Sequence, residues 1–257
     1  MARVLVTGSS TGLGLMAAEL LVEQGHRVVL HARNPTRADD VRRALSGAEA
    51  VVVGDLASLA GAREVAAQAN ALGRFDAVIH NAGVGYGAGR RLETEDGLPQ
   101  IFAVNVLAPY VLTALIERPA RLVYLSSGLH RGARLDLDDL AWRKRAWSSS
   151  AAYAESKLCD VLIAFAVSRR WPAVLSNAVD PGWVATRMGG AGAPDDPDQG
   201  RRTQAWLAVG DEPAARVSGR YFHHLRERAP DPQALSVALQ DRLVAECERL
   251  SGVALPG

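Results

Sequence analysis

A tyrosine and a lysine four positions apart are the residues best suited to chemistry in this 257-residue chain. They stand in the stretch YAESK, residues 153–157. On a helix this spacing places a phenol and an ammonium on one face. A neighbouring cation favours the phenolate, so it can turn a tyrosine, whose ordinary pKa is about 10, into an acid–base group. The same pair can also be an ordinary exposed couple, so its meaning depends on the rest of the chain.

A second pattern, TGSSTGLG at residues 7–14, could bind phosphate. Its glycines, Gly8, Gly12 and Gly14, follow a predicted strand and open a predicted helix. Small residues at such a turn let backbone N–H groups and the helix N-terminus approach a pyrophosphate. A glycine-rich stretch can be no more than a tight turn, but the strand–turn–helix context favours nucleotide binding.

The end of the second predicted strand, HAR at residues 31–33, bears on the type of nucleotide. An NAD site usually carries an acidic residue here for the ribose 2′-hydroxyl. The sequence has Ala32 and Arg33 instead. The planar guanidinium of Arg33 can pair with a 2′-phosphate, so we expect a preference for NADP(H). The alternative is an arginine that only covers the surface at a strand end.

Polar or small residues also follow the later strands. Asp55 could accept from an adenine amino group, and Leu56 could cover the ring. NAG at residues 81–83 leaves room for an adenosine ribose, and SSG at residues 126–128 ends the fifth strand. Asn105 stands alone in an apolar run, where a buried amide must be hydrogen-bonded. Each would be an ordinary feature by itself, and their shared position at strand ends gives them weight.

These residues need a frame of alternating strands and helices. Short β-rich runs are predicted at residues 3–8, 26–33, 50–56, 75–83, 121–127, 173–182 and 219–222. Helical segments separate most of them. Strand centres such as VVV and LVYL are continuously apolar, as in strands covered on both faces. We predict an α/β fold, a Rossmann-type doubly wound parallel sheet of about seven strands with helices on both faces, whose carboxyl edge gathers the polar motifs.

Composition argues against several classes of function. Apolar residues make up 48% of the chain and the formal net charge is +1. Basic residues are dispersed, so no nucleic-acid partner is expected. No apolar stretch approaches about 18 residues and no signal peptide is visible, so we expect no membrane contact and a cytoplasmic protein. Two cysteines, Cys159 and Cys247, are too few for a disulfide framework or a Cys-rich metal site, and no metal is expected.

Taken together, the motifs resemble those of the short-chain dehydrogenases/reductases. TGSSTGLG, NAG, Asn105, LSSG, YAESK and DPGWVAT (residues 180–186) occur in that family's order and at its strand positions. The resemblance covers nearly the whole chain and implies a single domain over residues 1–257. An insert at about residues 129–150 separates Ser127 from Tyr153 more widely than is usual. With SSxxH, SKLCDVLIAF and SGRYF, it is similar to the subgroup of retinol dehydrogenases and carbonyl reductases.

The resemblance implies a role for each residue of a catalytic set. Tyr153 is the general acid/base, and Lys157 and the oxidised nicotinamide lower its pKa. Lys157 also binds the nicotinamide ribose. Ser127 hydrogen-bonds the substrate oxygen, with Ser126 as the alternative serine. Asn105 anchors a water that joins Lys157 to solvent.

The resemblance also implies a cofactor site along the carboxyl edge of the sheet. Pro181 and Gly182 would flank the nicotinamide, and Thr186 would hydrogen-bond its carboxamide. The expected NADP(H) contacts are Gly8, Ser10, Thr11, Gly12, Leu13, Gly14, Arg33, Asp55, Leu56, Asn81, Ala82, Gly83, Tyr153, Lys157, Pro181, Gly182, Val184 and Thr186.

A stretch rich in glycine, proline and aspartate follows, MGGAGAPDDPDQG, within a predicted lid at about residues 187–205. Its position favours a segment that orders over the substrate, and a disordered surface loop is the alternative. The expected walls of the substrate site are Leu129, Trp147, Trp183 and Trp206. Because these are apolar, we expect the small-molecule carbonyl or alcohol substrate to be apolar or aromatic.

We therefore expect an NADP(H)-dependent carbonyl reductase or alcohol dehydrogenase, with the hydride supplied by the cofactor. One alternative is an NAD-linked alcohol dehydrogenase that works oxidatively. Another is a regulator that senses NADP(H) without turnover, against which the complete catalytic set argues. An amphipathic helix from Pro230 to the end can pack on the fold or on a partner subunit. The family contains homodimers, homotetramers and monomers, and the sequence leaves this choice open.

Overall fold

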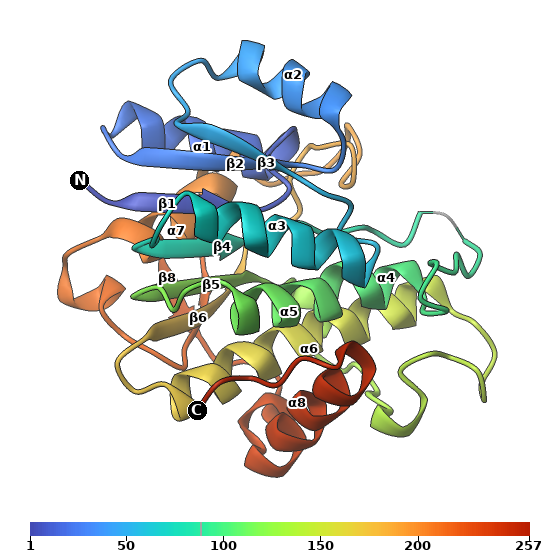
Figure 1. Cartoon of the computed structure of the whole chain (residues 1–257). Helices are drawn as coiled ribbons and strands as arrows, with labels where there is room; N and C mark the ends of the chain where they lie inside the picture. Colours follow the sequence, from blue (N-terminus) through green and yellow to red (C-terminus); the bar gives the residue numbers. More distant parts are fainter. Residues whose placement is uncertain (88) are drawn as a thin grey trace.

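The computed structural model describes residues 1–87 and 89–257, and the strands in these ranges form one sheet (Figure 1). The strand order is β3-β2-β1-β4-β5-β6-β7-β8. All neighbours pair in parallel except β7 and β8. The strands are β1 (Arg3–Val6), β2 (Arg27–Ala32), β3 (Ala50–Val53), β4 (Ala77–His80), β5 (Arg121–Leu125), β6 (Leu175–Asp180), β7 (Tyr221–His223) and β8 (Arg226–Arg228).

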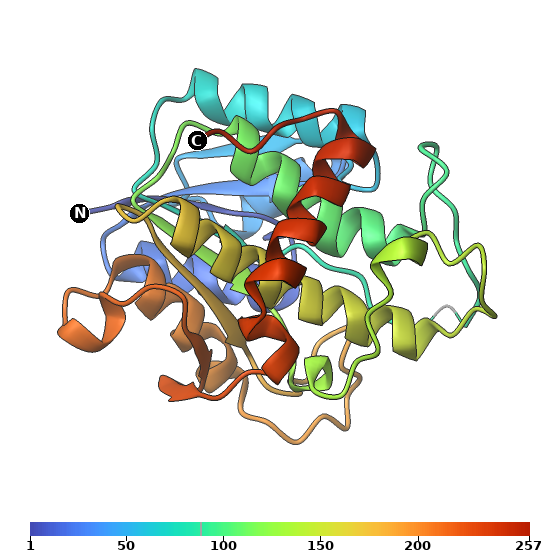
Figure 2. The ribbon, with the colours of Figure 1, turned by 90° about the horizontal axis from the view of Figure 1, so that it is seen from below.

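Helices cover both faces of the sheet. Buried residues of α3, α5 and α6 form the core on one face, and those of α1, α2 and α7 form the core on the other. α8 packs on α6, and Figure 2 shows it crossing the outside of that layer. The helices are α1 (Gly12–Glu23), α2 (Pro35–Ala44), α3 (Leu59–Ala71), α4 (Gln100–Phe102), α5 (Ala108–Leu115), α6 (Ser149–Arg170), α7 (Pro197–Val209) and α8 (Val237–Ser251). Within residues 1–87 and 89–257, no helix combines the length and apolar composition that a membrane crossing requires.

Strand β1 illustrates why the strand centres are continuously apolar. Leu5 packs into the core on one face of the sheet, and Val4 and Val6 pack into the core on the other. Successive side chains of a strand point to opposite faces, so both sets must be apolar when both faces are covered.

The strand order reverses at β1, which pairs with β2 on one side and with β4 on the other. At such a switch point the loops after the two inner strands diverge toward opposite faces, and ligands of open α/β sheets bind in the crevice between them. The glycine-rich turn follows β1, and residues 81–83 follow β4. Both predicted nucleotide motifs therefore lie at this point.

The predicted α/β sheet is confirmed, with one strand more than expected. β8 forms a hairpin with β7, and its three residues are all exposed. Because no face of β8 is buried, its sequence RER carries no apolar pattern from which a strand could be predicted. The two residues of the turn, His224 and Leu225, have φ angles of 46° and 64°, the left-handed conformation of a tight hairpin.

The predicted lid at residues 187–205 is only partly a loop. From Pro197 onward the chain is helix α7, which packs against α1. Thr203 and Gln204 are fully buried, as is Ala205. Residues 197–205 thus belong to the body of the fold, and the segment that could act as a lid is limited to residues 187–196.

The insert at residues 129–150 is anchored to α6. Arg145 forms a bidentate pair with buried Glu155, at 2.6 and 2.7 Å, and its guanidinium lies 3.7 Å from the centre of the Trp142 ring. Asp139 accepts the backbone N–H groups of Arg143 and Lys144 at 2.7 and 3.0 Å. These contacts fix the insert beside the helix that carries Tyr153.

Candidate active site

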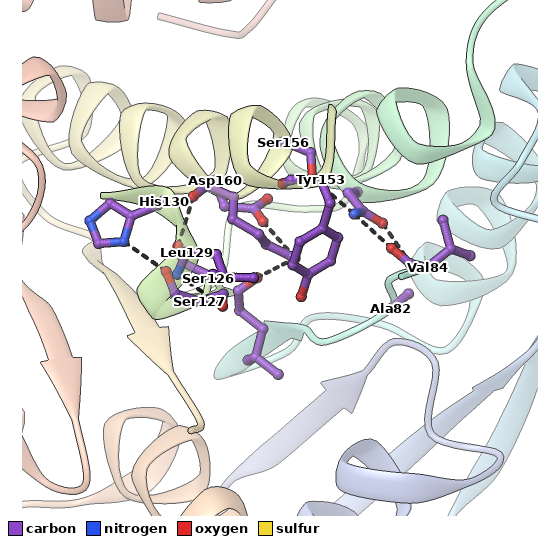
Figure 3. A network of polar contacts seen from close by, with 12 residues as sticks. Ala82, Val84, Ser126, Ser127, Leu129, His130, Tyr153, Ser156 and Asp160 are labelled. Carbon is purple, nitrogen blue, oxygen red and sulfur yellow. Dashed lines mark hydrogen bonds and ion pairs between the residues drawn. The ribbon is translucent and has the colours of Figure 1, made fainter. Parts of the chain in front are cut away.

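Tyr153 and Lys157 lie on α6, which packs against β5. Both side chains are buried, with 8% and 5% of their surface exposed. The Lys157 ammonium donates to the carbonyl of Leu125 at 2.7 Å and to a carboxylate oxygen of Asp160 at 2.8 Å. Figure 3 shows the Tyr153 ring between the loop of Ser126 and Ser127 and the loop that contains Val84.

The two serines after β5 differ in what their hydroxyls contact. Ser126 is buried, and its hydroxyl donates to the carbonyl of Lys157 at 2.7 Å, which joins β5 to α6. Ser127 is half-buried, and its oxygen accepts the N–H of Leu129 at 3.3 Å. Burial raises the pKa of Tyr153, and a hydrogen bond with the Ser127 hydroxyl offsets part of that rise. Ser127 therefore keeps a hydroxyl beside the phenol, whereas the Ser126 hydroxyl is used inside the fold.

His130 links the loop of Ser126 and Ser127, here called the serine loop, to the backbone of Asp231. Its ring is fully buried, with Nδ1 2.7 Å from the carbonyl oxygen of Ser127 and Nε2 accepting the N–H of Asp231 at 2.9 Å. A carbonyl oxygen can only accept, so Nδ1 carries the proton and the ring is neutral. Burial lowers the pKa of His130 and favours this neutral form.

Asn105 lies in a π-helical turn, Ala103–Leu107, between α4 and α5. Its side-chain oxygen accepts the N–H of Val84 at 2.8 Å, and its amide donates to the Val84 carbonyl at 3.1 Å and to the Ser156 hydroxyl at 3.0 Å. Ser156 in turn donates to the carbonyl of Tyr153 at 2.7 Å. The amide of Asn105 is thus occupied in joining the loop after β4 to α6, a contact through Ser156 that sequence reasoning missed.

The pKa of Tyr153 is raised, the opposite of the direction expected from Lys157. Burial of the phenol is the largest cause. Lys157 lowers the pKa, as predicted, but the carboxylates of Asp160 and Asp180 raise it. The groups of the protein therefore hold Tyr153 as a protonated phenol, which is the form that can donate a proton.

The glycine-rich turn after β1 has the shape of a phosphate cradle. Gly8 and Gly12 have φ angles of 64° and 62°. A Cβ on Gly8 would lie 2.7 Å from the Cα of Ala82, and one on Gly14 would lie 2.3 Å from the side-chain nitrogen of Asn81. The N-cap residue of α1, Thr11, caps none of the helix N–H groups with its side chain. These free donors and the absence of Cβ atoms fit a pyrophosphate group.

Two side chains brace this turn. Asn81 donates to the carbonyls of Thr7 and Gly8 at 2.9 and 3.3 Å. His31, buried in β2, accepts the N–H of Gly8 through Nδ1 at 2.9 Å, and its Nε2 lies 2.9 Å from the carbonyl oxygen of Gly54. The sequence alone does not indicate this role of His31, because only the pairing of β2 with β1 and β3 brings Gly8 and Gly54 to its two sides.

The residues predicted for the adenosine end of the cofactor lie in different surroundings. Arg33 is exposed at the end of β2. Asp55 is also exposed, and its carboxylate accepts the N–H of Ala57 at 2.9 Å. Leu56 requires a correction, because its side chain is 4% exposed and belongs to the core beneath α3. It cannot cover an adenine ring in this conformation, so its backbone is what remains available for a cofactor.

The loop after β6 passes over the glycine-rich turn. A Cβ on Gly12 would lie 3.8 Å from the methyl group of Thr186. A Cβ on Gly200 would lie 2.8 Å from Val184, 3.0 Å from Leu13 and 3.0 Å from the carbonyl oxygen of Pro181. Residues predicted to bind the pyrophosphate therefore lie next to residues predicted to bind the nicotinamide, although the two groups are more than 160 positions apart in the chain.

Four large apolar side chains on the loops beside Tyr153, here called the apolar collar, are those of Tyr86, Leu129, Trp183 and Met188, and two of them, Tyr86 and Met188, contact the tyrosine itself. The Met188 sulfur is 4.0 Å from the hydroxyl, and the Tyr86 ring meets the Tyr153 ring edge-on at 5.3 Å. Trp183 donates its indole N–H to the carbonyl of Gly189, next to Met188, at 2.8 Å. Leu129 extends from the serine loop (Figure 3). These four side chains are 47–61% exposed, and Tyr86 and Met188 were not among the predicted walls.

The other two predicted wall residues have different surroundings. Trp147 is half-buried and packs against Trp142, in a cluster that also contains Tyr153. The prediction that Trp206 lines the substrate site is wrong. Its ring packs against Phe222, and its indole N–H donates to Glu212 beyond the C-terminal end of α7. It stands nine residues into that helix, about 13 Å from the sheet edge where α7 begins. Its distance along α7 removes it from the substrate site.

Comparison with known proteins adds to this geometry. A family model for short chain dehydrogenase matches residues 2–127. An uncharacterised oxidoreductase of Emericella nidulans is 46% identical over 261 residues, covering 100% of both chains. Retinol dehydrogenase 13 of Homo sapiens is 34% identical over 286 residues, covering 98% of this chain and 85% of the human protein.

A solved structure shares the whole architecture. A protein from Mycobacterium Paratuberculosis superposes with a TM-score of 0.86 at 27% identity, covering 100% of this chain and 96% of that one. The full-length match to an oxidoreductase and the nucleotide-binding geometry at the switch point lead to one conclusion. The chain belongs to the short-chain dehydrogenase/reductase family, oxidoreductases that bind NAD(P)(H) and act on small molecules.

Proposed function

We propose that the protein is an NADP(H)-dependent oxidoreductase that interconverts a carbonyl and an alcohol, with Tyr153 as the general acid/base. The observation that carries this proposal is the convergence of the Tyr153 phenol, the Ser127 hydroxyl and the Lys157 ammonium. They come from α6 and the end of β5, two elements that Ser126 joins. A proton donor beside a second hydroxyl suits protonation of a carbonyl oxygen.

In the reductive direction, bound NADPH would supply the hydride that the carbonyl carbon accepts. Tyr153 transfers its phenolic proton to the carbonyl oxygen as negative charge develops there. Ser127 donates a hydrogen bond to the same oxygen and stabilises that charge. The phenolate that remains on Tyr153 is stabilised by the Lys157 ammonium. In the oxidative direction the phenolate accepts the alcohol proton through the same contacts.

The proton returns to Tyr153 through Lys157 and a water held by Asn105. Because Val84 and Ser156 occupy the amide of Asn105, we assign the water to its backbone carbonyl. The π-helical turn favours this assignment, since a widened turn interrupts the α-helical pairing of carbonyl groups.

The preference for NADP(H) rests on the end of β2. Ala32 is buried and Arg33 is exposed where an NAD site would place an acidic side chain. The fork of N–H donors on Arg33 matches a 2′-phosphate. The glycine-rich turn would hold the pyrophosphate, and Pro181, Gly182 and Thr186 would lie at the nicotinamide.

The substrate class follows from the apolar collar. The four side chains of the collar are about half exposed, and those of Tyr86 and Met188 contact Tyr153. Exposed apolar surface that is contiguous marks a binding site, and apolar walls with a few polar groups are typical of small-molecule pockets. We therefore propose an apolar or aromatic ketone, aldehyde or alcohol as substrate.

Consumption of NADPH, and separately of NADH, across a panel of aromatic, aliphatic and steroid-like aldehydes and ketones tests this function. We expect turnover with NADPH that is fastest with apolar or aromatic carbonyls. Tyr153→Phe should lower kcat by about 10³-fold, because proton transfer by a positioned side chain contributes about 10²–10⁴-fold. The Kd for NADPH should stay within about threefold of wild type, because the remaining contacts of the cradle are intact.

Tyr110→Phe is the matched control, since the Tyr110 hydroxyl donates to the carbonyl of Val253 inside the core. It should retain wild-type kcat. Wild-type kcat in Tyr153→Phe would contradict the acid/base assignment. Faster turnover with NADH than with NADPH would instead point to an NAD-linked dehydrogenase, and tight NADPH binding with no turnover on any carbonyl would point to a sensor.

A further inference from the structure

The catalytic lysine has a buried counter-ion that the proposed mechanism does not use. Asp160 lies three residues after Lys157 on α6, with 2% of its surface exposed. Its carboxylate oxygen is 2.8 Å from the Lys157 ammonium. A buried ion pair contributes little to stability compared with apolar side chains, because both charges lose their hydration. Stability alone is therefore a weak reason for a carboxylate at this position.

The hydrogen bonds of the Lys157 ammonium show how Asp160 orients it. A lysine has three N–H donors, and Leu125 and Asp160 take two of them. A Cβ on Gly83 would lie 3.8 Å from the ammonium nitrogen and 3.5 Å from the Asn105 oxygen. With two donors fixed on the side of β5 and α6, the third is left for the crevice beside Gly83.

The charges of Asp160 and Lys157 have opposite effects on the pKa of Tyr153. Burial raises the pKa of the Asp160 carboxyl to about 7, and Lys157 draws it downward. Above that pH Asp160 is an anion that raises the pKa of Tyr153, whereas Lys157 lowers it. The three groups titrate as a coupled set, so the effect of the lysine on the phenol depends on the state of the carboxylate.

We propose that Asp160 is a positioning residue that orients the Lys157 ammonium and offsets its charge, and thereby sets the pH at which Tyr153 exchanges its proton. This proposal rests on the proposed function. It gives the site a nearly neutral lysine–carboxylate unit, in which the phenol keeps its proton over a wider pH range than a lone lysine would allow.

The other charged and titratable groups around this set come from three elements. Asp180, at the end of β6, also raises the pKa of Tyr153, and Ser127 after β5 lowers it. Tyr124 of β5 and Cys159 of α6 interact with the Asp160 charge, and burial keeps both protonated by raising their pKa values. Glu155, on the same helix, is instead paired with Arg145.

Asp160→Asn tests the proposal, because it removes the charge while nearly preserving the shape. We expect the pH at which alcohol oxidation is half-maximal to fall by roughly one unit, since a lost neighbouring charge typically shifts a pKa by about one unit or more. Glu155→Gln is the matched control. It makes the same chemical change at a similarly buried, cation-paired carboxylate of α6 and should leave the profile in place.

A direct titration makes the test independent of turnover. Tyrosine labelled with ¹³C at Cζ reports ionisation of each phenol by NMR, and the Tyr153 signal is identified by its loss in Tyr153→Phe. The Tyr153 signal should titrate at lower pH in Asp160→Asn than in wild type. If no substrate is turned over but this shift occurs, the proposed function fails while the role of Asp160 stands.

Two results would overturn the proposal. One is a Tyr153 titration and a pH profile that Asp160→Asn leaves unmoved. The other is a shift to higher pH, which would mean that Lys157 loses its proton when its partner is removed. Asp160→Ser removes the same charge with a smaller side chain, so a folding defect of one variant can be told apart from an effect of charge by comparing Tm and titration in both.

Discussion

Ser126 and Ser127 are adjacent residues of one type, yet their hydroxyls have different uses. Ser126 is buried and bonded to the carbonyl of Lys157, while Ser127 remains beside the phenol of Tyr153. The side-chain amide of Asn105, like the hydroxyl of Ser126, is already hydrogen-bonded within the fold, to Val84 and Ser156. At the scale of residues, the polar atoms left unbonded by the fold decide which member of a motif is available for chemistry.

The first prediction at the scale of residues concerns the role of Arg33 in binding NADPH. Arg33→Ala should raise the Kd for NADPH about 10- to 100-fold, because a charge-assisted hydrogen-bonded contact is worth about 1.5–3 kcal/mol. The Kd for NADH should change less than about twofold, since NADH has no 2′-phosphate. Titration calorimetry with both nucleotides measures this.

Arg37→Ala is the control for Arg33. Arg37 lies in the first turn of α2 and is 3.7 Å from Asp40, with which it pairs. Its removal changes the net charge equally and should leave both Kd values unchanged. Equal weakening of NADPH and NADH in Arg33→Ala would contradict recognition of a 2′-phosphate.

At the scale of elements, the junction of β5 with α6 assembles the site. α6 supplies Tyr153, Lys157 and Asp160, and the end of β5 supplies the serine loop. His130 fixes that loop to the N–H of Asp231, near the start of the chain's last helical region. The junction is thus held from the sheet, from α6 and from the C-terminal part of the chain.

The two serines separate stability from rate at this junction. Ser126→Ala should lower the free energy of unfolding by about 1 kcal/mol, the typical worth of a hydrogen bond, and leave kcat within about threefold. Ser127→Ala should lower kcat by about 10²–10³-fold, because it removes a donor to the developing oxyanion, with almost no change in Tm.

Urea unfolding and steady-state kinetics on both variants measure these effects. We expect Ser126→Ala to lower mainly the free energy of unfolding and Ser127→Ala to lower mainly kcat. A larger loss of kcat in Ser126→Ala than in Ser127→Ala would exchange the roles of the two serines.

At the scale of the whole molecule, burial of several histidines couples stability to pH. His80 is buried at the end of β4, and burial lowers its pKa to about 3. Burial also lowers the pKa values of His31 and His130. Their folded-state pKa values lie below the unfolded value of about 6.5, so the unfolded chain binds more protons below that pH. Stability is fully present above about pH 6.5 and is lost as pH falls.

We therefore expect the free energy of unfolding to fall between pH 6.5 and 4, with His80 contributing about 1.4 kcal/mol per pH unit. His80→Gln should reduce this slope by about that amount. Urea titrations at several pH values give the slope, in which any constant loss from the substitution cancels. An unchanged slope in His80→Gln would contradict a neutral buried His80.

The sequence by itself determined the α/β class, the central strands and the family, because buried parallel strands must be continuously apolar and a phosphate turn must be built of small residues. It also singled out Tyr153 and Lys157, since four residues on a helix span one turn. These features depend on local composition and spacing, which are legible in the chain alone.

Only the tertiary structure decided the features that depend on contacts across the sheet. It placed Leu56 in the core, Trp206 toward the far end of α7, and residues 197–205 within that helix. It also brought Asp160 and Leu125 to the Lys157 ammonium and Ser156 to Asn105. A hydrogen bond or buried charge depends on which elements pack together. For Tyr153 this packing adds burial and the carboxylates of Asp160 and Asp180, which raise its pKa against the lowering by Lys157.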